Sequence, residues 1–188
     1  MEKKKVLTLL LGSPRKDGNT EKLADALAEG ASKKGYEVRK VRLASMNLKG
    51  CIDCRKCWST GKPCIQNDDM NDKVYPDIEA ADVLVFASPL YFYSWSTQIK
   101  PVWDRLIPFY AKEAPRTLKG KKSILLAAAG DTEESKLEGI TVSYKNCLEY
   151  LGWESLGEIT APGIYSKGDI EKLGEKYLKQ AEELGASL

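Results

Sequence analysis

The chain is organised around a stretch in which an apolar run ends in a polar loop that contains glycine. It reads Leu9-Leu10-Leu11-Gly12-Ser13-Pro14-Arg15-Lys16-Asp17-Gly18-Asn19-Thr20. The apolar run that begins at Val6 predicts a strand, and helical spacing begins at Glu21. A strand, a polar loop and a helix N-terminus together build a phosphate site, because the first N–H groups of a helix lack partners and carry partial positive charge.

The side chains of this loop are of the types that bind phosphate. Ser13, Asn19 and Thr20 carry hydrogen-bond donors, and Arg15 adds a charged fork. A P-loop is excluded because Asn19 stands where its lysine is required, and the dinucleotide fingerprint is excluded because its middle glycine is missing. The alternative is an ordinary strand-to-helix connection in which Asn19 or Thr20 caps the helix.

Length and composition limit the classes of function that fit. A chain of 188 residues predicts a single domain over residues 1–188, and a net charge of +2 gives no reason to expect a nucleic acid or a membrane as partner. The apolar run near the N-terminus is too short for a signal peptide, so we expect a cytoplasmic protein. Because the sequence has no histidine, the commonest general base is missing, and a cofactor is expected to carry any chemistry.

Apolar runs alternate with helical spacings along the rest of the chain. Strands are predicted at residues 6–11, 36–43, 82–89, 123–129 and 154–160. Helices are predicted over about 19–34, from near Thr97 to Ile107, behind a capping box of Asp131 and Glu134 as far as Leu151, and from Ile170 to Leu184. Residues 45–75 lack a clear period and hold four of the five cysteines, which is typical of a functional insertion.

This alternation predicts an α/β fold, a flavodoxin-like doubly wound five-stranded parallel sheet of order 2-1-3-4-5. The cysteine-rich insertion, residues 45–75, falls between the second and third strands. Ligands of such sheets bind beyond the carboxyl ends of the strands, so the loops 12–20, 89–97 and 129–134 are expected to meet there.

The loop after the third predicted strand is rich in aromatic residues. It reads Ser88-Pro89-Leu90-Tyr91-Phe92-Tyr93-Ser94-Trp95. Aromatic side chains beside a phosphate loop are typical of a platform for a flat ring, although Phe92 or Trp95 could instead fill the interface between strand and helix. A phosphate and a flat ring describe a mononucleotide, and both adenine nucleotides and FMN fit this description.

The cysteines of the insertion have a compact spacing. Cys51, Cys54 and Cys57 form C-x2-C-x2-C, and Cys64 follows after six residues. Four thiolates at this spacing suit a [4Fe-4S] cluster, because short gaps let one loop wrap several corners of the cluster. Two other interpretations remain, a zinc site and four free thiols. Cys147 lies on the apolar side of its predicted helix and is expected to fill the core.

The motifs together resemble a known family. Gly12-Ser13-Pro14-Arg15 with Gly18-Asn19-Thr20, Ser88-Pro89-Leu90-Tyr91, and Lys100 with Asp104-Arg105 resemble the NADPH-dependent FMN reductase superfamily over about residues 5–135. The cysteine segment resembles its iron–sulfur flavoprotein branch. The resemblance implies that Ser13, Arg15, Asn19 and Thr20 hold the FMN phosphate, that Pro89, Leu90, Tyr91 and Phe92 line the isoalloxazine ring, and that Gly130 and Asp131 close its other side. It also implies a homodimer or homotetramer.

The functional hypothesis that follows is an FMN-dependent oxidoreductase. NAD(P)H would reduce the flavin, and electrons would pass to a small-molecule or protein acceptor, with no side chain named as catalytic because the cofactor carries the chemistry. One alternative is an electron carrier that serves ferredoxin-like partners without turnover of its own. Another is a non-redox module in which zinc orders residues 45–75.

Overall fold

Five strands form one sheet in which all neighbours run parallel. The computed structural model of the chain describes residues 4–58, 64–110, 114 and 116–188. The strands are β1 (Val6–Leu11), β2 (Glu37–Arg42), β3 (Val83–Pro89), β4 (Lys122–Ala128) and β5 (Glu154–Ala161). Their order is β2-β1-β3-β4-β5, which confirms the predicted flavodoxin-like topology. The segment that carries Cys51 to Cys64 lies between β2 and β3, as expected, although its residues 59–63 are outside the described part.

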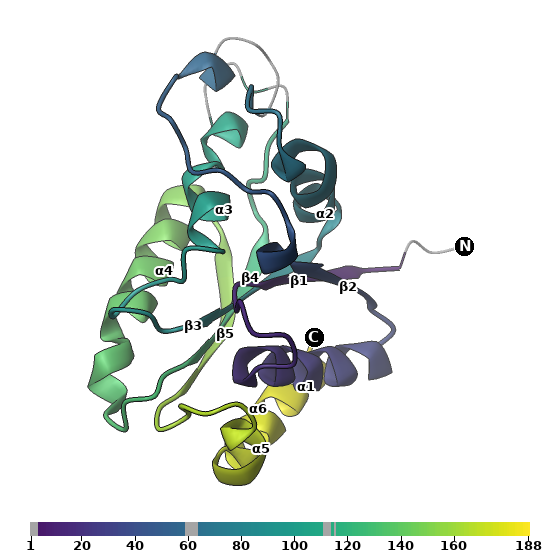
Figure 1. The fold of residues 1–188 in the computed structure, drawn as a ribbon. Helices are drawn as coiled ribbons and strands as arrows, with labels where there is room; N and C mark the ends of the chain where they lie inside the picture. Colours follow the sequence, from purple (N-terminus) through teal and green to yellow (C-terminus); the bar gives the residue numbers. More distant parts are fainter. Residues whose placement is uncertain (1–3, 59–63, 111–113, 115) are drawn as a thin grey trace.

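Helices cover both faces of the sheet (Figure 1). One face carries α1 (Asn19–Lys33), α5 (Asp169–Leu173) and α6 (Glu175–Ala186), and the other carries α2 (Tyr75–Ala80), α3 (Lys100–Asp104) and α4 (Glu138–Leu151). With helices on both faces, β1 is buried along its whole length, and so is β3 except at its last residue. This burial explains why their sequences are apolar without alternation, whereas the edge strand β2 is only partly buried.

Three helices differ from the sequence prediction. The helix expected from near residue 97 to 107 is the short α3, which is followed by a separate 3₁₀ turn at Ile107–Phe109. The closing helix is divided at Gly174 into α5 and α6, where a Cβ would lie 2.6 Å from Cδ1 of Ile170. The predicted capping box is wrong, because α4 begins only at Glu138 and the Asp131 carboxylate instead accepts a hydrogen bond of 2.9 Å from the N–H of Glu133.

The insertion ends in a helical segment that the sequence did not indicate. A π-helical turn, Met70–Val74, runs directly into α2, which has Pro76 in its first turn. A six-residue helix is too short to produce a recognisable apolar period, so the pattern of residues 45–75 reads as irregular. The segment around η2 (Lys56–Trp58) lies on the side of the sheet covered by α2, α3 and α4, at the end of the molecule that is farthest from α5 and α6 (Figure 1).

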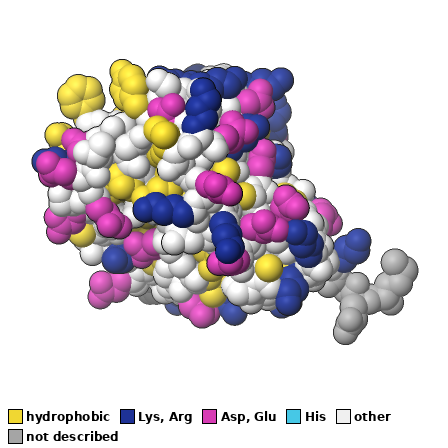
Figure 2. Space-filling view, turned by 90° about the horizontal axis from the view of Figure 1, so that it is seen from below, with side chains coloured by type: hydrophobic (Ala, Val, Ile, Leu, Met, Phe, Trp, Pro, Cys, Tyr) yellow, Lys and Arg dark blue, Asp and Glu magenta, His cyan; other side chains and the backbone are white. Residues whose placement is uncertain are grey.

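The face formed by α1, α5 and α6 carries charges of both signs. Figure 2 shows Lys and Arg side chains interspersed with Asp and Glu over this face, with single hydrophobic side chains between them. This mixture agrees with the small net charge of the sequence. In the described part of the chain, no helix combines the length and the apolar character needed to cross a bilayer.

Helices α1 and α6 approach closely because each has a glycine at the contact. A Cβ on Gly30 would lie 2.0 Å from the carbonyl oxygen of Glu182, and a Cβ on Gly185 would lie 2.0 Å from the carbonyl oxygen of Leu27. Both obstacles are backbone atoms, which cannot rotate away. The helices therefore pack backbone to backbone at this point.

This packing predicts that Gly185→Ala destabilises the protein. Alanine favours an isolated helix by up to about 1 kcal/mol, but overpacking against backbone is expected to cost roughly 1–3 kcal/mol. The net loss should appear as a lower midpoint of chemical unfolding. Gly50→Ala is the control, because a Cβ there meets nothing within 4 Å. Equal stability of both variants and the wild type would contradict the close contact.

Candidate functional site

A cavity of about 530 Å³ lies beyond the carboxyl ends of β1, β3 and β4. All ten residues named from the sequence as ligand-binding line it, together with six others. The lining consists of Ser13, Arg15, Asn19, Thr20, Pro89, Leu90, Tyr91, Phe92, Tyr93, Ala128, Ala129, Gly130, Asp131, Lys136, Ile164 and Tyr165. The three loops expected to meet at this edge of the sheet do meet there.

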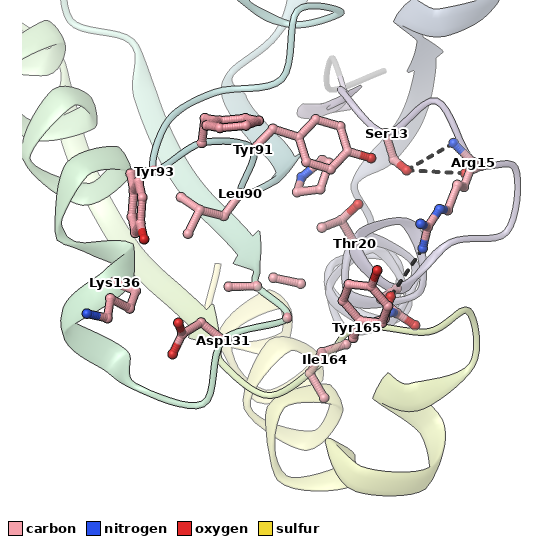
Figure 3. A pocket seen from close by; sticks show the side chains of 16 residues that line it. Ser13, Arg15, Thr20, Leu90, Tyr91, Tyr93, Asp131, Lys136, Ile164 and Tyr165 are labelled. Carbon is pink, nitrogen blue, oxygen red and sulfur yellow. Dashed lines mark hydrogen bonds between the residues drawn. The ribbon is translucent and has the colours of Figure 1, made fainter.

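The two ends of the cavity differ in character (Figure 3). Ser13, Arg15 and Thr20 lie at one end, and Asp131 and Lys136 lie at the other. Between these ends, Leu90 and Tyr91 from the loop after β3 face Ile164 and Tyr165 from the loop after β5. Both ends of the cavity are therefore polar, with Arg15 at one and the pair of Asp131 and Lys136 at the other, and apolar and aromatic side chains line the part between them.

The loop 12–20 is held in shape by short-range hydrogen bonds. The Ser13 hydroxyl accepts a bond of 3.1 Å from the N–H of Arg15, and Gly12 donates 2.8 Å to the carbonyl of Ala87 on β3. The Gly12 carbonyl in turn accepts 2.6 Å from the hydroxyl of Ser96. Helix α1 then begins at Asn19 with Gly18 as its N-cap, so its first N–H groups point toward this loop.

Asn19 does not cap the helix. Its side-chain nitrogen donates 2.8 Å to the carbonyl of Ser166, and its side-chain oxygen accepts from the N–H of Gly168 at 3.1 Å and of Ile170 at 3.4 Å. The interpretation of Asn19 as an ordinary helix cap is therefore wrong. The residue instead fastens the loop after β5 to the start of α1, and the Arg15 guanidinium supports the same contact by donating 3.2 Å to the carbonyl of Tyr165.

Glu21 is a residue of this region that the sequence analysis missed. Its buried carboxylate accepts 2.7 Å from the N–H of Asp17, which has a positive φ of 54°, and also pairs with Arg42 on β2. The ion pair neutralises a negative charge that would otherwise lie beside the first turn of α1. The Glu21 carboxylate therefore holds the end of the loop 12–20, while its charge, balanced by Arg42, does not repel an anion bound at that loop.

The aromatic loop makes a tight turn with a strained backbone. Tyr91 and Ser94 exchange backbone hydrogen bonds of 3.0 and 3.1 Å, and both central residues, Phe92 and Tyr93, have positive φ, 46° and 61°. Such conformations are costly for aromatic residues and concentrate at functional sites. The turn rests on Gly139, where a Cβ would lie 2.3 Å from the Tyr93 carbonyl oxygen.

The aromatic rings of this loop have different surroundings. Phe92 is 100% exposed and Tyr93 is also open to solvent, whereas Trp95 is buried against Phe86 and donates 3.0 Å to the hydroxyl of Ser143. Filling of the strand–helix interface is thus the role of Trp95 and is wrong for Phe92. An exposed ring on a strained turn at the mouth of a cavity favours a binding role.

Ile164 and Tyr165 form a wall that the sequence analysis also missed. A Cβ on Gly130 would lie 2.5 Å from Cδ2 of Tyr165, so the absence of a side chain at position 130 leaves room for this ring. The loop after the fifth predicted strand had to end at the same edge of the sheet as the others. That topological argument could have indicated the segment, although not the residues.

A second cavity, of about 410 Å³, is lined by the four clustered cysteines. Cys51, Cys54, Cys57 and Cys64 border it together with Arg105 from the end of α3. Burial, with a smaller contribution from the neighbouring thiols of Cys64, Cys54 and Cys51, raises the pKa of Cys57. Within residues 4–58, 64–110, 114 and 116–188, however, no three potential ligands converge as a single metal ion requires.

The base of the cysteine segment is fixed by a buried ion pair. The Arg105 guanidinium donates 2.6 and 2.9 Å to the two carboxylate oxygens of Asp68 and 3.0 Å to the carbonyl of Lys49. Asp68 also accepts 2.9 Å from the N–H of Lys49. Burial opposes the charge of Asp68, but these hydrogen bonds outweigh it and keep its pKa below the usual value. The two ends of the segment are thereby joined.

Cys147 lies elsewhere, half-buried on α4 and packed against the core, as expected. It borders a third cavity, between α3 and α4, with Val142 and Tyr150. None of the four clustered cysteines lines that cavity. We therefore separate Cys147 from the cysteine site.

Comparison with known proteins gives consistent matches. The sequence profile of NADPH-dependent FMN reductases matches residues 5–150. The chain is 33% identical over 183 residues to an iron-sulfur flavoprotein of Archaeoglobus fulgidus, an alignment that covers 95% of this chain and 76% of that protein. It is 32% identical over 124 residues to an iron-sulfur flavoprotein of Methanosarcina thermophila, covering 66% of this chain and 63% of that protein.

Two solved structures have the same fold. An NAD(P)H:quinone oxidoreductase from Methanothermobacter marburgensis superimposes with a TM-score of 0.76 and 19% identity, covering 98% of this chain and 96% of that one. An azoreductase from Bacillus anthracis superimposes with a TM-score of 0.74 and 18% identity, covering 99% and 100%. At these identities the likeness concerns the fold alone.

The contacts of Asn19 predict that Asn19→Ala loosens the loop after β5. Loss of its hydrogen bonds should cost roughly 1–2 kcal/mol of unfolding free energy and should speed hydrogen exchange of the Gly168 and Ile170 amides. Asn146→Ala, an exposed change on α4, is the control. Unchanged exchange of both amides in the Asn19 variant would show that the loop does not depend on this side chain.

Proposed function

The chain belongs to the NADPH-dependent FMN reductase family and is an FMN-dependent oxidoreductase, and on this premise we propose that NAD(P)H reduces its flavin and that the electrons pass to a second acceptor. The observation that carries the proposal is the convergence of ten sequence-predicted residues from three loops on one cavity. The chain is proposed to act as one FMN-binding domain over residues 1–188, in the cytoplasm, as a homodimer or homotetramer.

The lining of the cavity fits FMN. Its cationic end, with Arg15, the Ser13 and Thr20 hydroxyls and the first turn of α1, matches a phosphate. The walls formed by Leu90, Tyr91 and Tyr165, and the absence of a Cβ at Gly130, match a flat ring system. A volume of about 530 Å³ is typical of a cofactor pocket.

In this proposal the protein positions the cofactor and the nicotinamide. FMN, when bound, supplies the capacity to accept a hydride and to release electrons, so no side-chain base is required. Pro89, Leu90, Tyr91 and Phe92 hold one side of the ring, and Gly130 and Asp131 hold the other. Ser13, Arg15, Asn19 and Thr20 form the phosphate end, with Asn19 acting through the loop that it fastens.

We also propose that Cys51, Cys54, Cys57 and Cys64 hold a [4Fe-4S] cluster. Four thiols on one cavity are the donor set that such clusters use. A single zinc ion would draw its sulfur ligands to within about 3.8 Å of one another, given a Zn–S bond of about 2.3 Å. A cluster distributes its four thiolates over four irons, and the two-residue gaps between Cys51, Cys54 and Cys57 suit that distribution.

The main alternative is an electron carrier that exchanges electrons with ferredoxin-like partners. The exposed Cys51 and Cys54 favour this alternative, because a cluster at the surface is accessible to a protein partner. Steady-state oxidation of NAD(P)H by the purified holoprotein, with a quinone as acceptor, separates the two functions. We expect turnover. Reduction by a ferredoxin but not by NADH or NADPH would identify a carrier.

The phosphate end of the cavity predicts that FMN binds much more tightly than riboflavin. Arg15→Ala should remove about 1.5–3 kcal/mol of FMN binding, which corresponds to a roughly ten- to hundredfold higher Kd. It should weaken riboflavin binding much less, because riboflavin has no phosphate and only the support of Arg15 for the Tyr165 loop is lost. Titration of flavin fluorescence measures both constants, and Lys16→Ala serves as control because Lys16 does not line the cavity. Equal affinity for the two flavins would reject this placement of the phosphate.

The proposed cluster predicts that the four cysteines behave as one unit. Each single Cys→Ser variant, purified without oxygen, should lose most of its iron and its broad visible absorption but keep FMN, because the flavin cavity is separate. Cys147→Ser should lose neither. Wild-type protein that holds FMN but no iron under these conditions would make it a plain FMN reductase with a cysteine-rich loop.

A further inference from the structure

Arg105 has a hydrogen-bond donor that the ion pair does not use. Its side chain is only 1% exposed. Its two terminal nitrogens are occupied by Asp68 and by the carbonyl of Lys49. Its third nitrogen, Nε, is buried and has no hydrogen-bond partner among the described residues. A buried N–H group of a cation that has no acceptor costs folding free energy, so we expect an acceptor for Nε in the functional protein.

The surroundings of Arg105 indicate what that partner is. Arg105 lines the cavity bordered by all four clustered cysteines. Lys49 precedes the cysteine segment and Asp68 follows it, so the hydrogen bonds that Arg105 donates to both residues hold the two ends of the segment together. The acceptor expected for Nε of Arg105 is therefore a negatively charged sulfur atom in this cavity.

We infer that Arg105 is the positioning residue of the cysteine site. Its Nε–H donates a hydrogen bond to a sulfur atom of the bound cluster, and its positive charge offsets the negative charge of the four thiolates. The inference rests on the proposed cluster and extends it to a residue outside the cysteine motif. Asp68 and Lys49 orient the guanidinium, and Tyr75 holds its backbone by donating 2.6 Å to the Arg105 carbonyl. Hydrogen bonds and net charge at the sulfurs are the factors that tune the potential of such clusters.

The charge of Arg105 predicts the direction in which its removal shifts the reduction potential of the cluster. A nearby cation stabilises the reduced, more negative cluster and raises its potential, whereas the Asp68 carboxylate lowers it. Arg105→Gln should therefore shift the cluster potential downward, and Asp68→Asn should shift it upward. A purely structural role would not separate the two variants in this way, because both disturb the same ion pair at the base of the segment.

The test is a redox titration of the anaerobically purified holoprotein, in which the signal of the reduced cluster is followed by electron paramagnetic resonance. Iron, sulfide and FMN contents are measured on the same samples. We expect opposite shifts for Arg105→Gln and Asp68→Asn, with FMN content unchanged. Arg39→Gln is the matched control, because Arg39 pairs with Glu37 and Asp77 and does not line the cysteine cavity. It should leave the potential at the wild-type value.

A second variant covers the case in which Arg105→Gln leaves Asp68 unpaired and the protein fails to fold. The double variant Arg105→Gln/Asp68→Asn carries two neutral side chains, and its potential should lie below that of Asp68→Asn alone. Shifts in the same direction for the two single variants, or equal potentials of the double variant and Asp68→Asn, would overturn the role of Arg105. Wild-type protein without iron would instead overturn the cluster itself.

Discussion

The buried ion pair between Arg105 and Asp68 is the interaction on which the attachment of the cysteine segment to the rest of the fold depends. A guanidinium removed from water is tolerated only when its charge and most of its donors have partners. Asp68 and the carbonyl of Lys49 supply these partners from the two sides of the cysteine segment. Arg105 directly follows α3, and the segment before α3 is bound to the loop 12–20 because the Ser96 hydroxyl donates a hydrogen bond to the carbonyl of Gly12. One short helix therefore connects the cysteine segment to the loop 12–20.

The proposed flavin cavity depends on a different constraint, the common end of parallel strands. Loops from β1, β3, β4 and β5 reach the same edge of the sheet, and each contributes side chains to the lining of the cavity. Hydrogen bonds join these loops to one another. Asn19 binds the loop after β5, and Gly139 admits the strained turn that carries Phe92 and Tyr93.

The residues that sequence analysis missed have one feature in common. Tyr165 and Glu21 act through partners that are distant along the chain or through a contact that only close packing creates. Arg105 was noticed as part of a family motif, but nothing in that motif indicates that its guanidinium is buried beside the cysteines. Asn19 was assigned to the phosphate from its position, and the structure shows its amide turned toward residues 166–170.

The sequence by itself determined the strand order and the positions of the two sites. Continuous apolar runs of about six to eight residues that alternate with helical spacings favour buried parallel strands, and the loops after such strands end at the same edge of the sheet. The spacing of Cys51, Cys54, Cys57 and Cys64 likewise predicts a common site, and the structure places all four on one cavity. The division of the last helix, the short α3, the helical end of the insertion and the pairing of Arg105 with Asp68 were decided only by the tertiary structure. These features depend on contacts between segments far apart in sequence, and local periodicity contains no information about which side chain a distant segment will meet.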